Sequence, residues 1–440
     1  MKVSRIAVVV AAALLASAPA AVRAAEAAAA PQPQAQSQDK TYEQLKVLID
    51  VLDLIQENYV ETPDTQKLIQ GAAAGMVRTL DPFSQYMDPE AHKEIQTETE
   101  GQFGGLGIRV GMTEEWLTII TPLPGTPAYR AGILPNDRLV QIDGETTKDM
   151  TLSDTLKKLR GAPGTKVTLT ILRAPDDGKD GPWITKDFTL TREIVKIESV
   201  QSWMQEPGIG YLRIVEFSGR TAEDTLDALD DLKKKGMKAL ILDLRNNPGG
   251  LLSAAVEVAS DFLGDNKLIV YTQGRKPESR QEFHASAKAP FADLPMITLI
   301  NGGSASGSEI VTGALQDHKR SLIMGAQSYG KASVQSVIPL ADGSGLRLTV
   351  AHYYTPLGRS IARNDKTKTG GITPDIPIAI SQETEAKLYN QWDLVYAQGK
   401  KPRPGVKKED LVRDDVLESA LQLLRARDVL GSLKPAGKEG

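Results

Sequence analysis

The feature that most constrains this chain is a repeated order of strand and helix after residue 194. Apolar runs that are too short for helices, at 239–244 and 296–300, are each followed by a turn rich in glycine or serine and then by a helical pattern. Such an order favours layers of strands and helices, so we expect a mixed α/β core. The turn at 246–250 follows a buried strand, and ligand sites are frequent at the carboxyl ends of strands in these folds.

Candidate chemistry gathers between residues 296 and 340. Three serines stand where a strand gives way to a helix, and the free N–H groups of a helix start can hold an anion. These serines are Ser304, Ser306 and Ser308. Further on, Lys331 has no Asp or Glu within 327–339. For Lys331 to act as a base near neutral pH, its pKa must fall from about 10.4, and burial lowers the pKa of a lysine. We therefore interpret the segment as a serine–lysine pair of nucleophile and base.

Gln335 is the expected partner of the lysine. Side chains alternate between the two faces of a strand, so Lys331 and Gln335 are expected on one face, where the glutamine amide holds the lysine nitrogen without adding a charge. A carboxylate at that position would raise the pKa of the lysine. For Ser304 and Ser308 we expect helix capping, and for Glu309 a favourable interaction with the helix dipole.

Histidine and metal chemistry receive less support. The four histidines have no metal-binding spacing, so neither a metal nor a cofactor is expected. A Ser-His-Asp triad with His318 or His352 stays open, because triads are assembled in space. However, the G-x-S-x-G elbow is missing, since residue 304 is serine rather than glycine.

Short strands and glycine turns dominate residues 101–192. Their ordered pieces are a Gly-Leu-Gly-Ile loop, the stretch GTPAYRAGILPND and an Ile-Asp-Gly turn, which together resemble a PDZ domain. The backbone N–H groups of a glycine turn can hold a carboxylate, and the strand that begins near residue 108 offers an edge to an extended peptide. The predicted peptide contacts are Gly105, Leu106, Gly107 and Ile108.

The first residues carry the pattern of an export signal. A positive start, the apolar run 6–15 and small residues at 22–24 predict a signal peptide over 1–24, with an uncleaved anchor as the alternative. The tract 25–40 predicts a disordered linker. We expect a periplasmic location, with membrane association through the anchor as the alternative. The chain has no cysteine, which excludes disulfides and a thiol nucleophile, and its net charge of -4 gives nucleic acid no basic surface.

Helical patterns flank the two central regions. Apolar residues recur at helical spacing from residue 41, and Pro63 separates two predicted helices within a helical region over 41–98, which we interpret as a packing or dimerisation element. The mixed α/β core is expected at 193–380. The last region, 381–440, predicts helices and a tail that form a cap or a dimer surface at most.

The complete set of motifs resembles the carboxyl-terminal processing proteases, the tail-specific S41 serine peptidases. The likeness spans nearly the whole chain and rests on LDLRNNPGG, NGGSASGSEI, SYGKASVQ and TPLGRSI with GITPDI. It implies a ClpP/crotonase-like layered core with an inserted PDZ domain and helical ends. It also implies Ser306 as nucleophile, Lys331 as base and Gln335 as the residue that orients the base. The implied oxyanion hole joins the N–H groups of Gly307 and Gly250. The family usually has alanine after the nucleophile, so Gly307 is a departure.

This resemblance leads to an exported serine endopeptidase that binds C-terminal tails through its PDZ domain and cleaves nearby through an acyl-enzyme. The implied partners are protein substrates, further copies of the chain in a dimer or larger homo-oligomer, and, as in some relatives, an adaptor protein. We also expect tail binding to move the PDZ domain off the active-site cleft. Two alternatives remain open: a catalytically silent PDZ scaffold that binds peptides, and a ligand-binding α/β protein of crotonase-like build.

Overall fold

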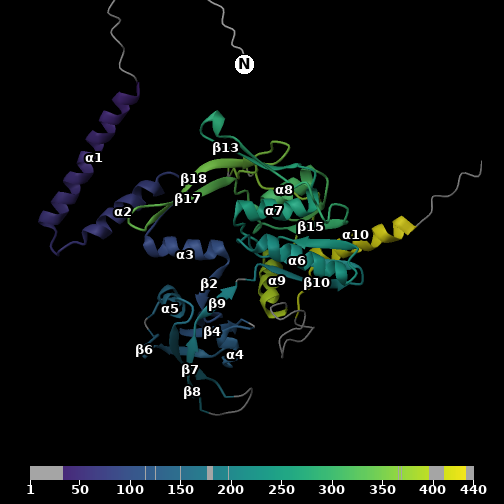
Figure 1. Ribbon diagram of the computed structural model, residues 1–440, viewed down its shortest axis with the longest axis horizontal. Helices are drawn as coiled ribbons and strands as arrows, with labels where there is room; N and C mark the ends of the chain where they lie inside the picture. The colour runs from purple at the N-terminus through teal and green to yellow at the C-terminus, as the bar shows by residue number, and fades with distance from the viewer. Residues whose placement is uncertain are drawn as a thin grey trace, which may run out of the picture. The chain divides into compact units, whose positions relative to one another are not determined.

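Figure 1 shows the computed structural model of the chain, which describes residues 33–113, 115–123, 125–148, 150–175, 182–196, 198–364, 366–367, 369–395 and 411–432. The predicted signal peptide, 1–24, lies outside these residues. The chain divides into two compact units, Met1–Gly71 and Ala72–Gly440. No helix among the described residues is long and apolar enough to cross a membrane.

The described part of the first unit is helical. It consists of α1 (Pro33–Asn58) and the start of α2 (Thr65–Arg78). Because α1 begins at Pro33, the prediction of a disordered linker is wrong for residues 33–40: proline suits a first helical turn, and the glutamines, alanine and lysine that follow favour a helix. The break at Pro63 is confirmed, and Asp64 caps α2 by accepting hydrogen bonds from the N–H groups of Gln66 and Lys67 at 3.0 and 3.2 Å.

Residues 102–196 of the second unit form a small β domain with its own buried core. The strand order of its sheet is β3 (Ile108–Thr113), β4 (Trp116–Pro122), β5 (Arg138–Ile142), β7 (Lys166–Arg173) and β8 (Ile184–Thr191), with β6 (Glu145–Thr146) beside β5. β2 (Gln102–Gly105) pairs with β9 (Glu193–Lys196), and α4 (Pro127–Arg130) and α5 (Leu152–Leu159) complete the domain. β3 stands at one edge of the described sheet, as the sequence predicts.

A mainly parallel sheet forms the centre of the second unit. Its order is β10 (Val200–Glu206), β11 (Ile209–Ile214), β12 (Ala239–Asp243), β15 (Met296–Ile300), β16 (Leu322–Gly325) and β19 (Ile376–Pro377), and only the β10–β11 pair is antiparallel. Residues alternate between two cores: Leu240 and Leu242 pack with α6 (Thr221–Lys234), α7 (Leu252–Leu263) and α8 (Gly307–Asp317). Ile241 and Leu299 face the other core.

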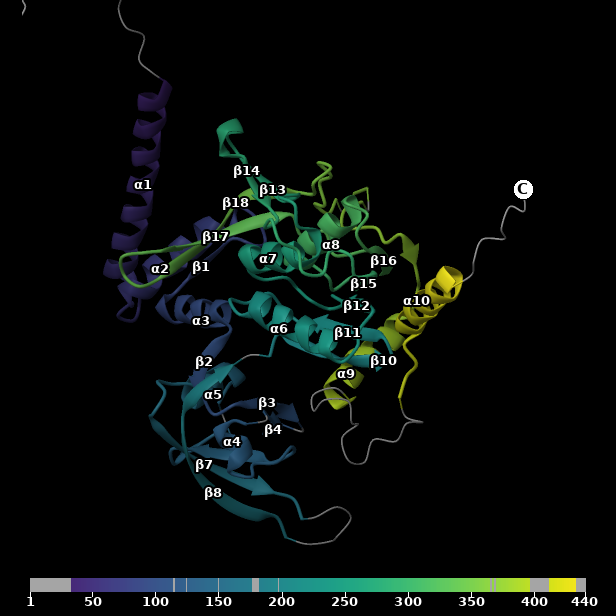
Figure 2. The same ribbon diagram turned by 45° about the vertical axis from the view of Figure 1, so that its right-hand side comes forward.

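A second, antiparallel sheet carries the lysine segment. Its order is β1 (Gln85–Met87), β18 (Gly345–Tyr354), β13 (Leu268–Gly274) and β14 (Gln281–His284), and β17 (Ser333–Pro339) also pairs with β18. The short helix η1 (Pro277–Ser279) lies between β13 and β14, and α3 (Pro89–Glu100) follows β1. Figure 2 shows β17 and β18 side by side next to α7 and α8.

The last helix that the structure describes belongs to the core. α9 (Gln382–Val395) precedes α10 (Asp415–Ser432), which buries Leu417 and Leu421 against the side chains of Tyr211 and Ile241. Arg245 pairs with Asp243 at 2.6 Å and with Asp414, just before α10, at 2.8 Å. Of the two predicted roles, a cap or a dimer surface, the packing of α10 agrees with the cap, since its apolar face covers the sheet. The mixed α/β fold class is confirmed.

Candidate active site

Ser306 occupies a strained turn between β15 and α8. Its backbone has φ of +53° and ψ of -111°, a region that residues other than glycine rarely adopt. Ser304 Oγ donates to the carbonyl oxygen of Leu244 at 2.8 Å, and Ser308 Oγ donates to that of Asn247 at 3.0 Å. These serines tie the turn to the end of β12, and the capping position is Ser306, so the capping roles predicted for Ser304 and Ser308 are wrong.

One buried carboxylate, Glu309, fixes both the serine turn and the lysine segment. Its Oε2 accepts the N–H groups of Ser306 and Lys331, each at 2.9 Å. Its Oε1 accepts the N–H of Gly330 at 2.7 Å and the hydroxyl of Ser328 at 2.5 Å. Burial raises the pKa of the Glu309 carboxyl, and these hydrogen bonds act in the opposite direction. From the sequence, Glu309 is expected only to interact with the helix dipole. Its place as the third residue of the helix is the one local sign that its carboxylate also binds the backbone of the serine turn.

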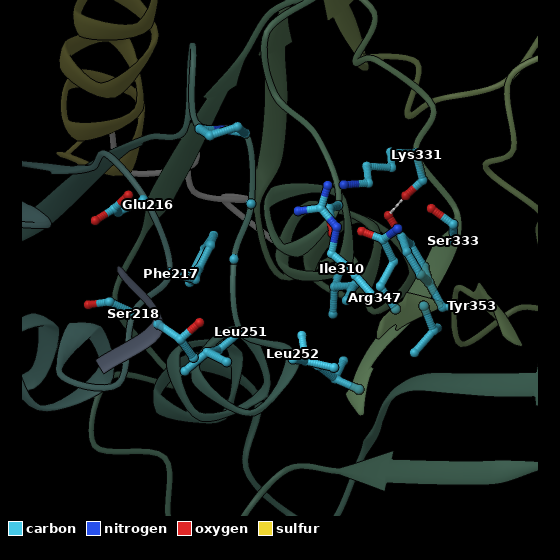
Figure 3. A pocket seen from close by; sticks show the side chains of 18 of the residues that line it. Glu216, Phe217, Ser218, Leu251, Leu252, Ile310, Lys331, Ser333, Arg347 and Tyr353 are labelled. Carbon is cyan, nitrogen blue, oxygen red and sulfur yellow. Dashed lines mark hydrogen bonds between the residues drawn. The ribbon is translucent and has the colours of Figure 1, made fainter. Parts of the chain in front are cut away.

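A cavity of about 430 Å³ opens beside the turn, and Ser306, Lys331, Gln335 and Gly250 all line it. Figure 3 shows its walls, with Phe217 and Leu251 across from Lys331. The aliphatic side chains that line it include Ile95, Leu252, Ile310, Val334 and Val337. Among the described residues that line it there is no histidine, and the Nε2 of His318 instead lies 2.7 Å from the carbonyl oxygen of Leu268. The triad alternative therefore gains no support.

The surroundings of Lys331 favour its neutral form. Burial lowers the pKa of Lys331, the charge of Arg347 lowers it further, and the charge of Glu309 raises it. The lysine nitrogen lies 5.2 Å from the centre of the Phe83 ring. The carbonyl oxygen of Lys331 accepts a hydrogen bond from the Tyr353 hydroxyl, drawn as the dashed line in Figure 3. In the described part of the chain, no carboxylate forms an ion pair with the lysine.

Two N–H groups beside the serine have no acceptor in the part of the chain that the structure describes. Phe217 pairs with the glycine turn by donating to the carbonyl oxygen of Gly249 at 2.9 Å and accepting the N–H of Leu251 at 2.7 Å. The N–H of Gly250 takes no part in this pairing, and Gly307 is the first residue of α8. Within the described residues neither glycine donates a hydrogen bond, so both N–H groups are available to a developing oxyanion.

Close packing explains the glycines around Ser306. A Cβ at Gly249 would lie 2.6 Å from the Cβ of Ser306 and 2.8 Å from the nitrogen of Gly307. A Cβ at Gly307 would lie 2.9 Å from a ring carbon of Phe217. The glycine that departs from the family pattern therefore makes room for this ring. Asn247 holds the turn by accepting the N–H of Gly249 at 2.8 Å.

Gln335 lines the cavity but does not hold the lysine. Its Nε2 donates to the carbonyl oxygen of Phe83 at 2.5 Å, and no hydrogen bond joins the described side chains of Gln335 and Lys331. The prediction assumed a regular strand through both residues. Lys331 instead precedes β17, and a bulge between Val334 and Gln335 interrupts the alternation of faces.

The predicted PDZ loop lies between β2 and β3. Leu106 is buried in the domain core, so its side chain supports the loop rather than facing a peptide. Gly107 has φ of +70°, and a Cβ there would lie 2.3 Å from Thr126. Among the described residues the N–H groups of Leu106 and Gly107 have no acceptor. Gly105 ends β2 and Ile108 begins the edge strand β3, so the backbone is arranged as the predicted peptide site requires.

No group of three His, Asp or Glu side chains in the described residues is placed to hold a metal ion. The catalytic roles predicted for Ser306, Lys331 and Gln335 stay predictions, although the fold brings the three side chains to one cavity.

Comparison with known proteins identifies the family. Residues 208–378 match peptidase family S41, 118–173 match a PDZ domain, and 8–91 match the N-terminal domain of the activating protease CtpB. The carboxy-terminal-processing protease of Bartonella bacilliformis is 44% identical over 366 residues, covering 82% of this chain and 80% of the relative. The carboxyl-terminal-processing protease of Synechocystis is 37% identical, with 78% and 79% covered.

A solved structure, the photosystem II D1 C-terminal processing protease, is 29% identical, with 75% of this chain and 92% of that chain covered and a TM-score of 0.43. These two relatives match 82% and 78% of the chain. The chain belongs to the carboxy-terminal processing proteases of peptidase family S41, serine proteases that here carry a PDZ domain.

Proposed function

We propose that the protein is an exported serine endopeptidase that binds the C-terminal tails of proteins through its PDZ domain and cleaves them with Ser306 and Lys331. One observation carries the proposal: a serine in a strained turn and a half-buried lysine, unpaired within the described structure, line the same cavity. The strained turn presents the nucleophile, and the lowered pKa of the lysine supplies the base.

The proposed reaction uses groups of this chain alone. Neutral Lys331 takes the proton of the Ser306 hydroxyl while Oγ attacks the substrate carbonyl carbon. The N–H groups of Gly250 and Gly307 hold the oxygen that becomes negative. Lys331 then gives the proton to the leaving amine, which breaks the C–N bond and leaves an acyl-enzyme. Water, deprotonated by Lys331, attacks the ester, and the proton returns to Ser306 as the acid leaves.

Capture of the tail is proposed to use the edge of β3 and the loop at Gly105–Ile108. The two N–H groups without acceptors in the loop suit a terminal carboxylate, and the free edge of β3 suits an extended peptide. Movement of the PDZ domain upon tail binding, and dependence on an adaptor protein, remain parts of the proposal to be tested by comparing tailed and tail-less substrates.

Self-association and export complete the proposal. Apolar side chains along α1 are exposed, and burial against a second copy would remove them from water. They include Leu45, Leu48, Ile49, Val51 and Leu54. Light scattering of the protein with and without residues 33–58 tests this, and an unchanged mass would reject α1 as the contact. The charged and apolar pattern at 1–24 supports export to the periplasm, which cell fractionation tests.

The function is tested with an unfolded reporter protein that ends in an apolar tail, together with Ser306→Ala, Lys331→Met and, as a control, Lys276→Met at an exposed lysine. We expect cleavage by the wild type and the control and loss of cleavage in the two site variants, with tail binding retained. A fluorophosphonate probe should label Ser306 in the wild type and in Lys276→Met, and it should not label the Ser306→Ala variant. Binding without cleavage or labelling would favour the silent scaffold instead.

A further inference from the structure

Arg347 is a second cationic side chain in the active-site cavity. It stands in β18 between two strands, opposite Gln85 of β1 and Val337 of β17. Its residue lines the same cavity as Lys331, and Figure 3 shows its guanidinium extending toward the lysine nitrogen. The influence of its charge on the pKa of Lys331 is consistent with this closeness.

The guanidinium is left with donors to spare. Its Nη2 donates to the side-chain oxygen of Gln85 at 3.0 Å, whereas its buried Nε has no acceptor among the described residues. In the described part of the chain no carboxylate pairs with Arg347. Buried donors normally have an acceptor, and guanidinium groups bind carboxylates through two parallel hydrogen bonds. A carboxylate is therefore the acceptor that suits this side chain best.

The opposite charge is also missing from this part of the cavity wall. Glu309 gives its oxygens to Ser306, Ser328, Gly330 and Lys331, and none of them to Arg347. Glu216 lines the cavity as well, but Figure 3 shows it beside Phe217 and Ser218, across the cavity from Arg347. The acceptor for the guanidinium must therefore come from outside the described chain.

We infer that Arg347 is a specificity residue that binds a carboxylate of the substrate close to the scissile bond. The inference rests on the proposed peptidase function. The carboxylate has two possible sources: an Asp or Glu side chain of the substrate, or the terminal carboxylate of a short leaving segment.

The neighbouring base explains why a charged donor suits this place. A substrate carboxylate near Lys331 alone would raise the pKa of the lysine and keep the base protonated. Arg347 pairs with that carboxylate and compensates its charge, so an acidic substrate can bind while Lys331 stays neutral. A neutral donor in the same position would bind the carboxylate without this compensation.

The test uses matched peptides hydrolysed by the full chain. One series places Glu or Gln at each position near the scissile bond, and a second carries a free or amidated C-terminus close to it. We expect the wild type to prefer the carboxylate by about tenfold or more in kcat/KM in one of the series, the size expected for a hydrogen bond to a charged group. The series that shows the preference identifies the source of the carboxylate.

Arg347→Gln should bring that ratio close to one, and Arg347→Lys should retain part of it because a point charge remains. Arg280→Gln, at an exposed arginine just before β14, should keep the wild-type ratio. The ratio is the decisive quantity, because both peptides of a pair meet the same serine and lysine and any general damage cancels.

A wild-type ratio near one in both series, or the same preference in Arg347→Gln, would overturn the inference. In either case cleavage of the Gln and amide peptides would leave the peptidase function standing. A lower melting temperature of Arg347→Gln with an unchanged ratio would assign the side chain to bridging β18 and Gln85. If no peptide of either series is cleaved, while Ser306→Ala is equally silent, the proposed function fails and the inference falls with it.

Discussion

Glu309→Gln gives the sharpest test of how the proposed serine–lysine pair is held together. The carboxylate accepts four hydrogen bonds, three of them from backbone N–H groups at Ser306, Gly330 and Lys331. A glutamine has the same shape but only one acceptor oxygen. When that oxygen serves Ser306 and Lys331, the new amide faces the hydroxyl of Ser328, which can turn and accept. It also faces the N–H of Gly330, which cannot.

The substitution therefore leaves one buried N–H without an acceptor. Such a loss costs about 1–3 kcal/mol in the free energy of unfolding. If the whole cost appears where the serine and lysine meet the substrate, kcat/KM falls by roughly 5- to 150-fold. We expect a value inside this range, because the strained backbone of Ser306 is among the groups that the carboxylate fixes.

The pH profile separates this effect from simple damage. The charge of Glu309 raises the pKa of Lys331, so its removal lowers that pKa, and the acid limb of kcat/KM moves to lower pH. Arg347→Gln removes a charge that lowers the same pKa, so its acid limb moves to higher pH. Peptide hydrolysis across the pH range, with Glu257→Gln at an exposed position of α7 as control, measures both. Limbs that stay in place, or that move in the same direction, would refute the assignment of Lys331 as the base.

Three further predictions test the fold around the site. A Cβ at Gly250 would lie 2.0 Å from the Phe217 carbonyl oxygen, and the backbone there has φ of +144°. Gly250→Ala should therefore displace the proposed oxyanion donor and lower kcat/KM by about 100-fold or more. Gly302→Ala, with open space around it, should stay active. Leu421→Ala in α10 should lower the free energy of unfolding in urea by about 2–5 kcal/mol; a loss near zero would contradict the core role of this helix. Burial raises the pKa of Asp261 from 3.8 to about 7, so ionisation of this carboxyl opposes folding, and stability falls as pH rises from the lower value to the higher one. Asp261→Asn should therefore stabilise the protein at and above the higher pKa and leave its stability unchanged below the lower one. Urea titrations on either side of these two pKa values measure the difference.

Local patterns in the sequence predict most of the strands and helices that surround the site. The apolar run of β15 and the helix start at Ser306 are both visible in neighbouring residues, and so is the break at Pro63. The place of α10 is not visible in this way. Its partners Tyr211 and Ile241 lie far away in the sequence, and the apolar spacing of a helix says which face is buried but not what covers it.

The same holds for the site: some of its residues can be predicted from their neighbours in the sequence, and others only from the folded chain. The absence of nearby carboxylates draws attention to Lys331, and the resemblance to the family selects Ser306 among three neighbouring serines. The fold brings both residues to one cavity. The sequence does not predict the role of Glu309, because its hydrogen-bond partners Ser328 and Gly330 come close to it only in the folded chain. The sequence does not predict that Arg347 lines the cavity, because a single arginine in a strand carries no pattern that distinguishes a cavity residue from a surface residue.

The predicted hydrogen bond between Gln335 and Lys331 is absent from the described residues for a related reason, and this leads to a last prediction. Gln335 donates to the carbonyl oxygen of Phe83, a residue 252 positions away, and the Phe83 ring lies 5.2 Å from the nitrogen of Lys331. Gln335 therefore reaches the lysine through Phe83. Phe83→Leu removes the ring beside the lysine, and Gln335→Ala removes the hydrogen bond that holds the backbone of the same residue. Both substitutions therefore act on the contact between the Phe83 ring and Lys331, and their effects on kcat/KM should not add.

A double-mutant cycle measures this coupling directly. We expect the double variant to lose less than the sum of the two single losses in transition-state free energy, with a coupling of about 0.5–3 kcal/mol, as for residues in contact. Effects that add would show that Gln335 acts on the lysine without Phe83, as the regular-strand prediction supposes. Melting temperatures of all four proteins provide the control, because non-additive losses of activity that merely follow unfolding would appear there as well.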